Sequence, residues 1–202
     1  MVWHAVVMKW RPIEIDREIN WRRVLTALSA VVVLGGLVFA TLSYRWFINP
    51  SEQEPGTADV VYVLGGGGSR VDLALDLVRD GVADRIVFSS SYVASQGVWA
   101  ATPCNQVATP DMPRGTIFEC YEADPGTTRG EAQLLADMAD ERGWESVVVV
   151  ASTDQVTRAR RLIDRCWDGE VKMTSVPHDQ LVLARVAYEW GAGIKATFLR
   201  GC

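Results

Sequence analysis

The feature that most constrains this chain is an uncharged apolar stretch near its N-terminus, VLTALSAVVVLGGLVFATLSY, residues 24–44. As a helix, these residues would span roughly 30 Å, the thickness of a bilayer core. Several basic residues precede the stretch: Lys9, Arg11, Arg17, Arg22 and Arg23. Soon after it, Arg45 stands alone among basic residues. The positive-inside rule therefore predicts a single-pass anchor at 23–47 in the cell membrane, with residues 1–22 cytoplasmic and the main domain outside.

Two other interpretations of this stretch compete with an anchor. A cleaved signal peptide is disfavoured because its leading segment would be unusually long and no small-x-small cleavage site follows the apolar run. A buried helix of a soluble domain is disfavoured because the run lies between arginines. It also has an aromatic rim of Trp21, Tyr44 and Trp46, typical of a membrane interface.

All four cysteines follow the apolar stretch, on the predicted outer side. In an oxidising compartment four cysteines allow three pairings, of which we favour Cys104–Cys120 and Cys166–Cys202. The first pair would close a loop, and the second would tie the C-terminal residue to the body of the domain. The cysteine pattern thus agrees with export.

The composition argues against metal binding and against nucleic-acid binding. The chain has no C-x-x-C motif and two histidines, His4 and His178, and His178 has no partner at ligand spacing. The formal net charge is −5, and basic residues beyond the N-terminus are dispersed. We therefore expect no metal, no cofactor and no nucleic-acid partner.

Beyond a polar linker at 48–57, strand-like and helix-like segments alternate. Strands are predicted at 60–64, 85–90, 117–121, 146–151 and 171–176, and helices at 70–79, 128–142, 155–167 and 179–192. This order predicts an α/β domain over 58–202, with a Rossmann-like, mainly parallel sheet and helices on both faces. Residues 92–116 hold three prolines and no clear period, so a long surface loop is expected there.

Four consecutive glycines, Gly65, Gly66, Gly67 and Gly68, stand between the first strand and the first helix. Their amides and the following helix N-terminus could cradle an anion, with Arg70 adding a positive charge. A dinucleotide fingerprint would need glycine at position 70, and the G-K-[ST] of a nucleotide-binding loop is absent. A tight strand-to-helix turn without ligand is the structural alternative.

Two further polar segments follow predicted strands and open helices. In EADPGTTRGE, residues 122–131, Thr128 and Glu131 have capping-box spacing. In STDQVTRAR, residues 152–160, Ser152 and Gln155 have the same spacing. Helix capping alone explains both pairs. It does not explain why so many polar residues gather at one edge of the sheet, where α/β proteins bind ligands.

Together these segments resemble the YdcF/SanA/ElyC-like family. The matching pieces are ADVVYVLGGGGSR at 58–70, EADPGTTRGE at 122–131, STDQVTRAR at 152–160 and the late Glu189-Trp190. The resemblance covers about residues 58–200. It implies a strand-end pocket and a role in the bacterial cell envelope, linked to cell-wall precursors. The family's reaction is not established.

The resemblance also implies which residues form the pocket. Carried over by position, they are Asp59, Gly65, Gly66, Gly67, Gly68, Arg70, Glu122, Thr128, Arg129, Glu131, Ser152, Thr153 and Arg158. Members commonly have histidine where this chain has Gln155. Histidine titrates near neutral pH, whereas glutamine can hydrogen-bond a ligand but cannot titrate, so we expect this position to bind without catalysing.

Two functions follow as hypotheses. In the first, the outer domain binds an anionic ligand, a phosphorylated or lipid-linked saccharide, and hydrolyses or transfers it with Glu122 as the base. In the second, the protein is a non-catalytic accessory subunit that docks on a larger membrane complex. Gly35 and Gly36, which permit close helix packing, and the missing histidine favour the second.

Overall fold

A computed structural model describes residues 20–66, 68–105, 112–177, 182–198 and 202. Its helices are α1 (Trp21–Ser43), α2 (Ser69–Arg79), α3 (Thr128–Arg142), α4 (Val156–Cys166) and α5 (Val182–Phe198). Its strands are β1 (Val60–Val63), β2 (Arg85–Ser89), β3 (Tyr92–Val93), β4 (Val98–Trp99), β5 (Ile117–Tyr121), β6 (Ser146–Ser152) and β7 (Glu170–Val176). A π-helical turn, Tyr44–Ile48, extends α1, and short 3-10 turns lie at Thr102–Asn105 and Thr153–Gln155.

The apolar stretch forms a helix that is long and apolar enough to cross a membrane, running from Trp21 to Ile48 with its π-helical turn. Its side chains are exposed along most of its length, so the interpretation as a buried core helix is wrong. The chain forms two compact units that meet in sequence between Ala40 and Thr41, so the end of this helix belongs to the α/β unit. The prediction for residues 1–22 falls almost entirely outside the described residues.

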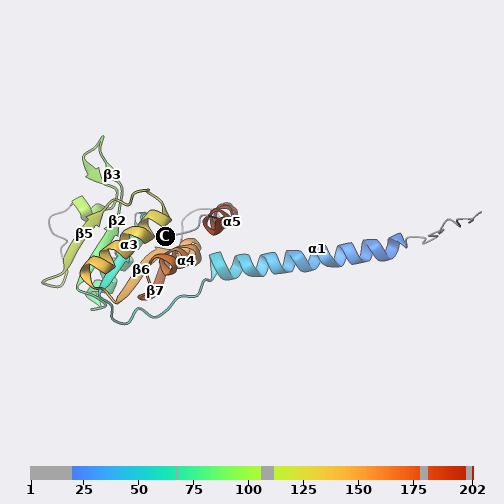
Figure 1. Cartoon of the computed structure of the whole chain (residues 1–202), viewed down its shortest axis with the longest axis horizontal. Coiled ribbons are helices and arrows are strands. Elements are labelled where there is room, and N and C mark those ends of the chain that lie inside the picture. The colour runs from blue at the N-terminus through green and yellow to red at the C-terminus, as the bar shows by residue number, and fades with distance from the viewer. Residues whose placement is uncertain (1–19, 67, 106–111, 178–181, 199–201) are drawn as a thin grey trace, which may run out of the picture. The chain divides into compact units, whose positions relative to one another are not determined.

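The α/β unit is built on a five-stranded parallel sheet, as predicted, and its strand order is β5-β2-β1-β6-β7 (Figure 1). Val60–Val63 and Val147–Ala151 are buried on both faces, which explains why these strands are continuous apolar runs. Side chains of α3 and α4 pack on one face and those of α2 on the other. The strand order reverses between β1 and β6, the point where open α/β sheets bind ligands.

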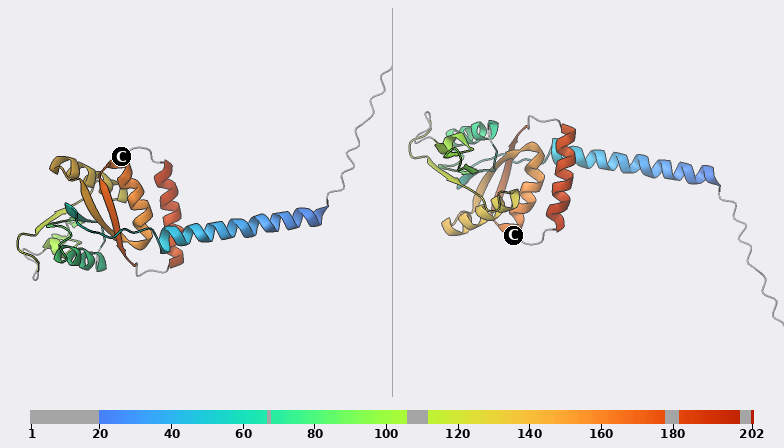
Figure 2. Two further views of the ribbon diagram at one scale, coloured as in Figure 1. Left: turned by 90° about the horizontal axis from the view of Figure 1, so that it is seen from below. Right: turned by 90° about the horizontal axis from the view of Figure 1, so that it is seen from above.

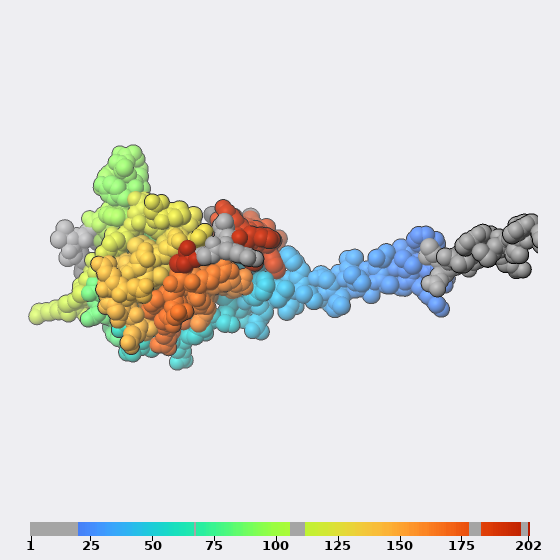
Figure 3. Space-filling view, in the orientation of Figure 1, coloured from blue at the N-terminus to red at the C-terminus, as the bar shows by residue number. Residues whose placement is uncertain are grey.

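The segment at 92–116 has more structure than the predicted loop. It begins with the antiparallel β3–β4 hairpin, in which the rings of Tyr92 and Trp99 lie 5.3 Å apart. The hairpin projects from the surface of the unit (green, Figure 3). A disulfide between Cys104 and Cys120 ties the segment to β5. The segment thus gains regular structure by pairing two short strands, although its sequence has no clear period. Residues 106–111 lie outside the described part of the chain.

The predicted linker packs on the sheet. Gln53 pairs with Met173 of β7, donating its amide N–H at 3.2 Å and accepting on its side-chain oxygen at 3.1 Å. These bonds occupy part of an edge strand that would otherwise be open. The segment therefore belongs to the α/β unit rather than forming a free tether.

The C-terminal helix α5 lies beside α4 in both views of Figure 2. It continues six residues past its predicted end at Ala192, because packing outweighs the low helix propensity of Gly191 and Gly193. Its predicted start, Asp179, lies outside the described residues. The second disulfide joins Cys166 to Cys202, so both favoured cysteine pairings are confirmed.

Candidate functional site

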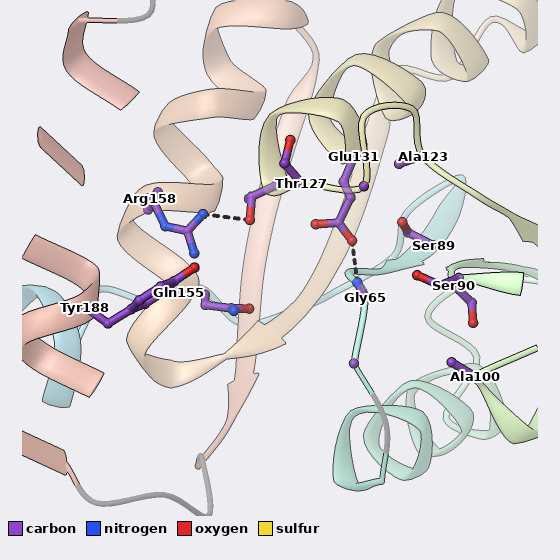
Figure 4. A pocket seen from close by; sticks show the side chains of 14 residues that line it. Gly65, Ser89, Ser90, Ala100, Ala123, Thr127, Glu131, Gln155, Arg158 and Tyr188 are labelled. Atoms are coloured by element: carbon purple, nitrogen blue, oxygen red, sulfur yellow. Dashed lines mark hydrogen bonds between the residues drawn. The ribbon is translucent and has the colours of Figure 1, made fainter. Parts of the chain in front are cut away.

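A polar cavity of about 360 Å³ lies at the carboxyl edge of the sheet. It is lined by Gly65, Gly66, Ser89, Ser90, Ser91, Ala100, Ala123, Gly126, Thr127, Thr128, Glu131, Gln155, Arg158 and Tyr188. Figure 4 shows Arg158, Gln155 and Tyr188 on one side, Ser89, Ser90 and Ala100 on the other, and Glu131 between them. The cavity therefore brings together the carboxyl ends of neighbouring strands and the first turns of α3 and α4.

Glu131 is the carboxylate that faces this cavity, and it is nearly buried. Its Oε1 accepts a hydrogen bond from the amide of Gly65, which joins the glycine loop to α3 (Figure 4). The backbone carbonyl of Glu131 accepts from the hydroxyl of Tyr62 at 3.0 Å. Burial, together with the Glu131 charge, raises the pKa of Tyr62, so this hydroxyl stays a donor.

The first turn of α3 is capped by a different residue from the one predicted. Thr127, not Thr128, is the N-cap, and its hydroxyl accepts from the amide of Gly130 at 3.3 Å. A Cβ on Gly130 would lie 2.0 Å from the carbonyl oxygen of Pro125, so only glycine lets the preceding loop fold onto this turn. The capping-box interpretation of Thr128 and Glu131 is wrong, and both side chains are left to line the cavity.

Arg158 is held in the cavity wall by a buried carboxylate on α5. Its Nε and one terminal nitrogen donate to Glu189 at 2.8 and 3.0 Å, and its other terminal nitrogen donates to Thr128 at 2.7 Å. Burial acts to lower the pKa of Arg158, but the bonds and charge of Glu189 outweigh it and raise the pKa. A rigid guanidinium thus links α4, α3 and α5 beside the cavity.

Arg70 has a different role from the one predicted. Its guanidinium turns under the glycine loop and donates to the carbonyl oxygens of Leu64 and Gly65. A second nitrogen reaches the hydroxyl of Ser152 at 3.4 Å. Burial lowers the pKa of Arg70. The side chain does not line the cavity; it holds the loop that does.

The glycine run accommodates that arginine. Gly66 has a φ of 140°, and a Cβ there would meet the guanidinium carbon of Arg70 at 2.5 Å. Gly68, with φ 65°, is the N-cap position of α2 and does not line the cavity. Gly67 lies outside the described residues. The run therefore serves both the turn and the buried arginine, and its first two members also face the cavity.

Several other predicted site residues lie elsewhere. Asp59 is at the opposite end of β1, where its carboxylate accepts from the amides of Glu145 and Ser146, each at 2.8 Å. Glu122 accepts from the amide of Tyr92 at 3.2 Å and does not line the cavity. The structure does not bring either carboxylate to the cavity.

The remaining predicted residues are engaged in packing contacts. Arg129 donates to the carbonyl of Cys202 at 3.2 Å. The hydroxyl of Thr153 lies 2.9 Å from that of Ser175, and Ser152 is buried next to Arg70. By contrast Thr128, Glu131, Gln155 and Arg158 do line the cavity, together with Gly65 and Gly66.

Sequence reasoning missed Ser89, the last residue of β2, and Ser90 and Ser91, which follow it. Three consecutive serines at the carboxyl end of a predicted parallel strand were a usable signal, since such ends share one edge of the sheet. Tyr188 gave no local signal, because only the packing of α5 brings it to the cavity. Among the described residues, no group of three or more His, Cys, Asp or Glu side chains is placed to hold a metal ion.

No protein-family model, curated protein or solved structure matches this chain. The resemblance to the YdcF/SanA/ElyC-like family therefore stays a prediction.

Proposed function

We propose that this chain is a YdcF-like, single-pass membrane protein of the cell envelope whose outer α/β domain binds a phosphorylated or lipid-linked saccharide. The observation that carries the proposal is the cavity itself. In this cavity the glycine loop, the first turn of α3, the guanidinium of Arg158 and the carboxylate of Glu131 come together where the strand order reverses. The apolar helix and two disulfides support a membrane-anchored, exported domain.

The phosphate would lie against the cationic side of the cavity. The first turn of α3 presents the positive end of a helix dipole there, and Arg158 stands beside it. Arg158 uses three N–H groups in its bonds to Glu189 and Thr128 and has five in all, so it keeps donors for a ligand oxygen. Glu189 partly offsets its charge, which favours a monoanionic or dianionic group over a polyphosphate.

The saccharide would occupy the polar remainder of the cavity. Glu131 accepts hydrogen bonds from hydroxyls, while Ser89, Ser90 and Gln155 can both donate and accept. Glu131 is also the titratable carboxylate that faces the ligand, so we assign it the role of base in any reaction, in place of Glu122. Gln155 cannot carry a proton, and we therefore propose binding as the primary activity.

The test is thermal unfolding of the full-length protein in detergent with its disulfides intact. The ligands are a hexose 1-phosphate, the neutral hexose, a nucleoside diphosphate and a short polyprenyl phosphate. A ligand present at about 100 times its dissociation constant should stabilise by about 2.7 kcal/mol. For a domain of this size that is a shift of roughly 5–10 °C.

Gln155→Ala is the variant that separates binding from folding. It should reduce the shift while leaving the melting temperature without ligand unchanged. Gln133→Ala, the same change on α3 at a residue that does not line the cavity, is the control. If no compound shifts a well-folded sample, the binding proposal fails, and the accessory-subunit hypothesis is pursued by pull-down through the anchor helix.

A further inference from the structure

Helix α5 carries an exposed apolar face. Leu183 is 85% exposed and Phe198 is 80% exposed, and Ile194 between them is also open to solvent. Ala187 and Gly191 complete a stripe at helical spacing, and both are exposed. Large apolar side chains aligned on one helix face usually mark a contact with a partner or a membrane.

The opposite face of α5 holds the helix to the domain. Glu189 pairs with Arg158, and Arg185 donates to Asp154 at 2.7 Å. The carbonyl of Ala196 accepts from Arg165 at 2.8 Å. These contacts fix which side of α5 faces outward. The exposed stripe is therefore a stable surface feature of the folded domain.

Contacts join α5 to the end of the apolar helix. The indole N–H of Trp190 donates to the hydroxyl of Ser43 at 2.9 Å, and its ring lies 5.3 Å from that of Trp46 and 5.7 Å from that of Phe47. Ser43 follows Ala40, the last residue of the N-terminal unit, by three positions. The middle of α5 is thus attached to the last residues of the apolar helix, which ends at Ile48.

Arginines flank the same region. A groove of about 520 Å³ is lined by Arg45, Trp46, Ser51, Val156, Thr157, Arg160, Arg161, Asp164 and Arg165. Arg161 and Trp46 also line a more apolar groove against α5, together with Ile194. Four arginines and one aspartate give this surface an excess of positive charge. Anionic headgroups are attracted to such a surface.

We infer that α5 is a second membrane-contacting element. Its outer face, with Leu183, Ile194 and Phe198, lies in the headgroup region of the bilayer, and the arginine groove binds the phosphate of an anionic phospholipid. A helix with an apolar face beside basic residues is the pattern of an interfacial helix. This inference goes beyond the proposed function, because it holds whatever ligand the cavity takes.

The experiment uses the full-length protein in vesicles of phosphatidylcholine and phosphatidylglycerol, at about three to one. The photoreactive residue p-benzoylphenylalanine replaces Leu183 or Phe198, or, as a control, Glu141, which is exposed on α3. Lipid adducts are expected from positions 183 and 198, at least several-fold above position 141. Adducts with a second copy of the chain, no adducts, or equal yields at all three positions would overturn the inference.

Two further arms test the physical basis. Leu183→Glu combined with Ile194→Glu should lower the lipid adduct from position 198 several-fold, since both side chains are exposed and the fold should be kept. An unchanged melting temperature confirms that the variant is folded. Vesicles of phosphatidylcholine alone should also lower the yield. An adduct yield unchanged by the charged variant contradicts apolar contact, and one unchanged by lipid composition contradicts phosphate binding in the groove.

Discussion

Replacing Glu189 with glutamine tests how strongly the ion pair beside the cavity holds α5 to the rest of the domain. Glu189 is fully buried, with both carboxylate oxygens bonded to Arg158 and one of them 3.6 Å from Arg185. Glutamine has the same shape but no charge, and its amide nitrogen cannot accept a hydrogen bond. The variant removes the negative charge that the guanidinium groups of Arg158 and Arg185 both approach.

The cost follows from the burial of the pair. Breaking a buried ion pair by removing one partner costs about 3–5 kcal/mol. The side chain of Arg158 is 12% exposed and glutamine keeps one acceptor, so we expect the lower end, about 3 kcal/mol. For a domain of this size that lowers the melting temperature by roughly 6–12 °C.

The assay is urea unfolding of the full-length protein in detergent, with the disulfides intact. Asp164→Asn is the matched control, because Asp164 is 52% exposed and lies 3.8 Å from Arg160 on the same helix. Exposed pairs contribute little, so this change should stay within about 0.5 kcal/mol. A loss below about 1 kcal/mol for Glu189→Gln, or equal losses for the two variants, would refute the reasoning.

Three other predictions concern stability. Hydrogen bonds from backbone amides lower the pKa of Asp59 below 3.8 in the folded state. The stability that its carboxylate contributes is therefore present above pH 3.8 and is lost as the pH falls through the folded-state pKa. Asp59→Asn should cost about 1 kcal/mol at neutral pH, allowing for solvent exposure, and almost nothing in acid, as measured by urea unfolding at both pH values. Gly66→Ala should cost about 1–3 kcal/mol in the same assay, because it forces a positive φ on alanine and displaces Arg70, and a neutral result would contradict the loop geometry. Cys166→Ser with Cys202→Ser opens a link across 36 positions and should cost about 3–4 kcal/mol by thermal unfolding, whereas reducing agent should then have less effect on the variant than on the wild type.

The fold was predictable because its signals are local. The continuous valines of β6 are typical of a strand buried on both faces, and Gly143, with a φ of 68°, is a typical residue at the end of a helix such as α3. The β3–β4 hairpin was missed, since a pair of two-residue strands has no periodicity to detect. The end of α5 was placed early for a related reason. Its glycines lower helix propensity, but contacts with distant residues keep the helix intact.

The candidate site was predictable only in part. Parallel strands end at a common edge, so the sequence identified Gly65, Thr128, Glu131 and Gln155 as neighbours of a cavity. It could not distinguish Glu131 from Glu122, because both follow the same strand. The choice depends on side-chain direction, which the turn between β5 and α3 sets. Arg70 was likewise placed near the right loop, but on its buried side.

The sequence by itself determined the elements of this protein: an apolar helix, alternating strands and helices, and polar residues at the strand ends. Each of these depends on residues that are close along the chain, through periodicity, hydrophobicity or turn chemistry. The tertiary structure alone decided which polar side chains meet. Arg158 and Glu189 are 31 positions apart, and Trp190 and Ser43 are 147 apart. Such pairs form because packing brings distant residues together. The sequence around each residue does not indicate which distant residue it will contact.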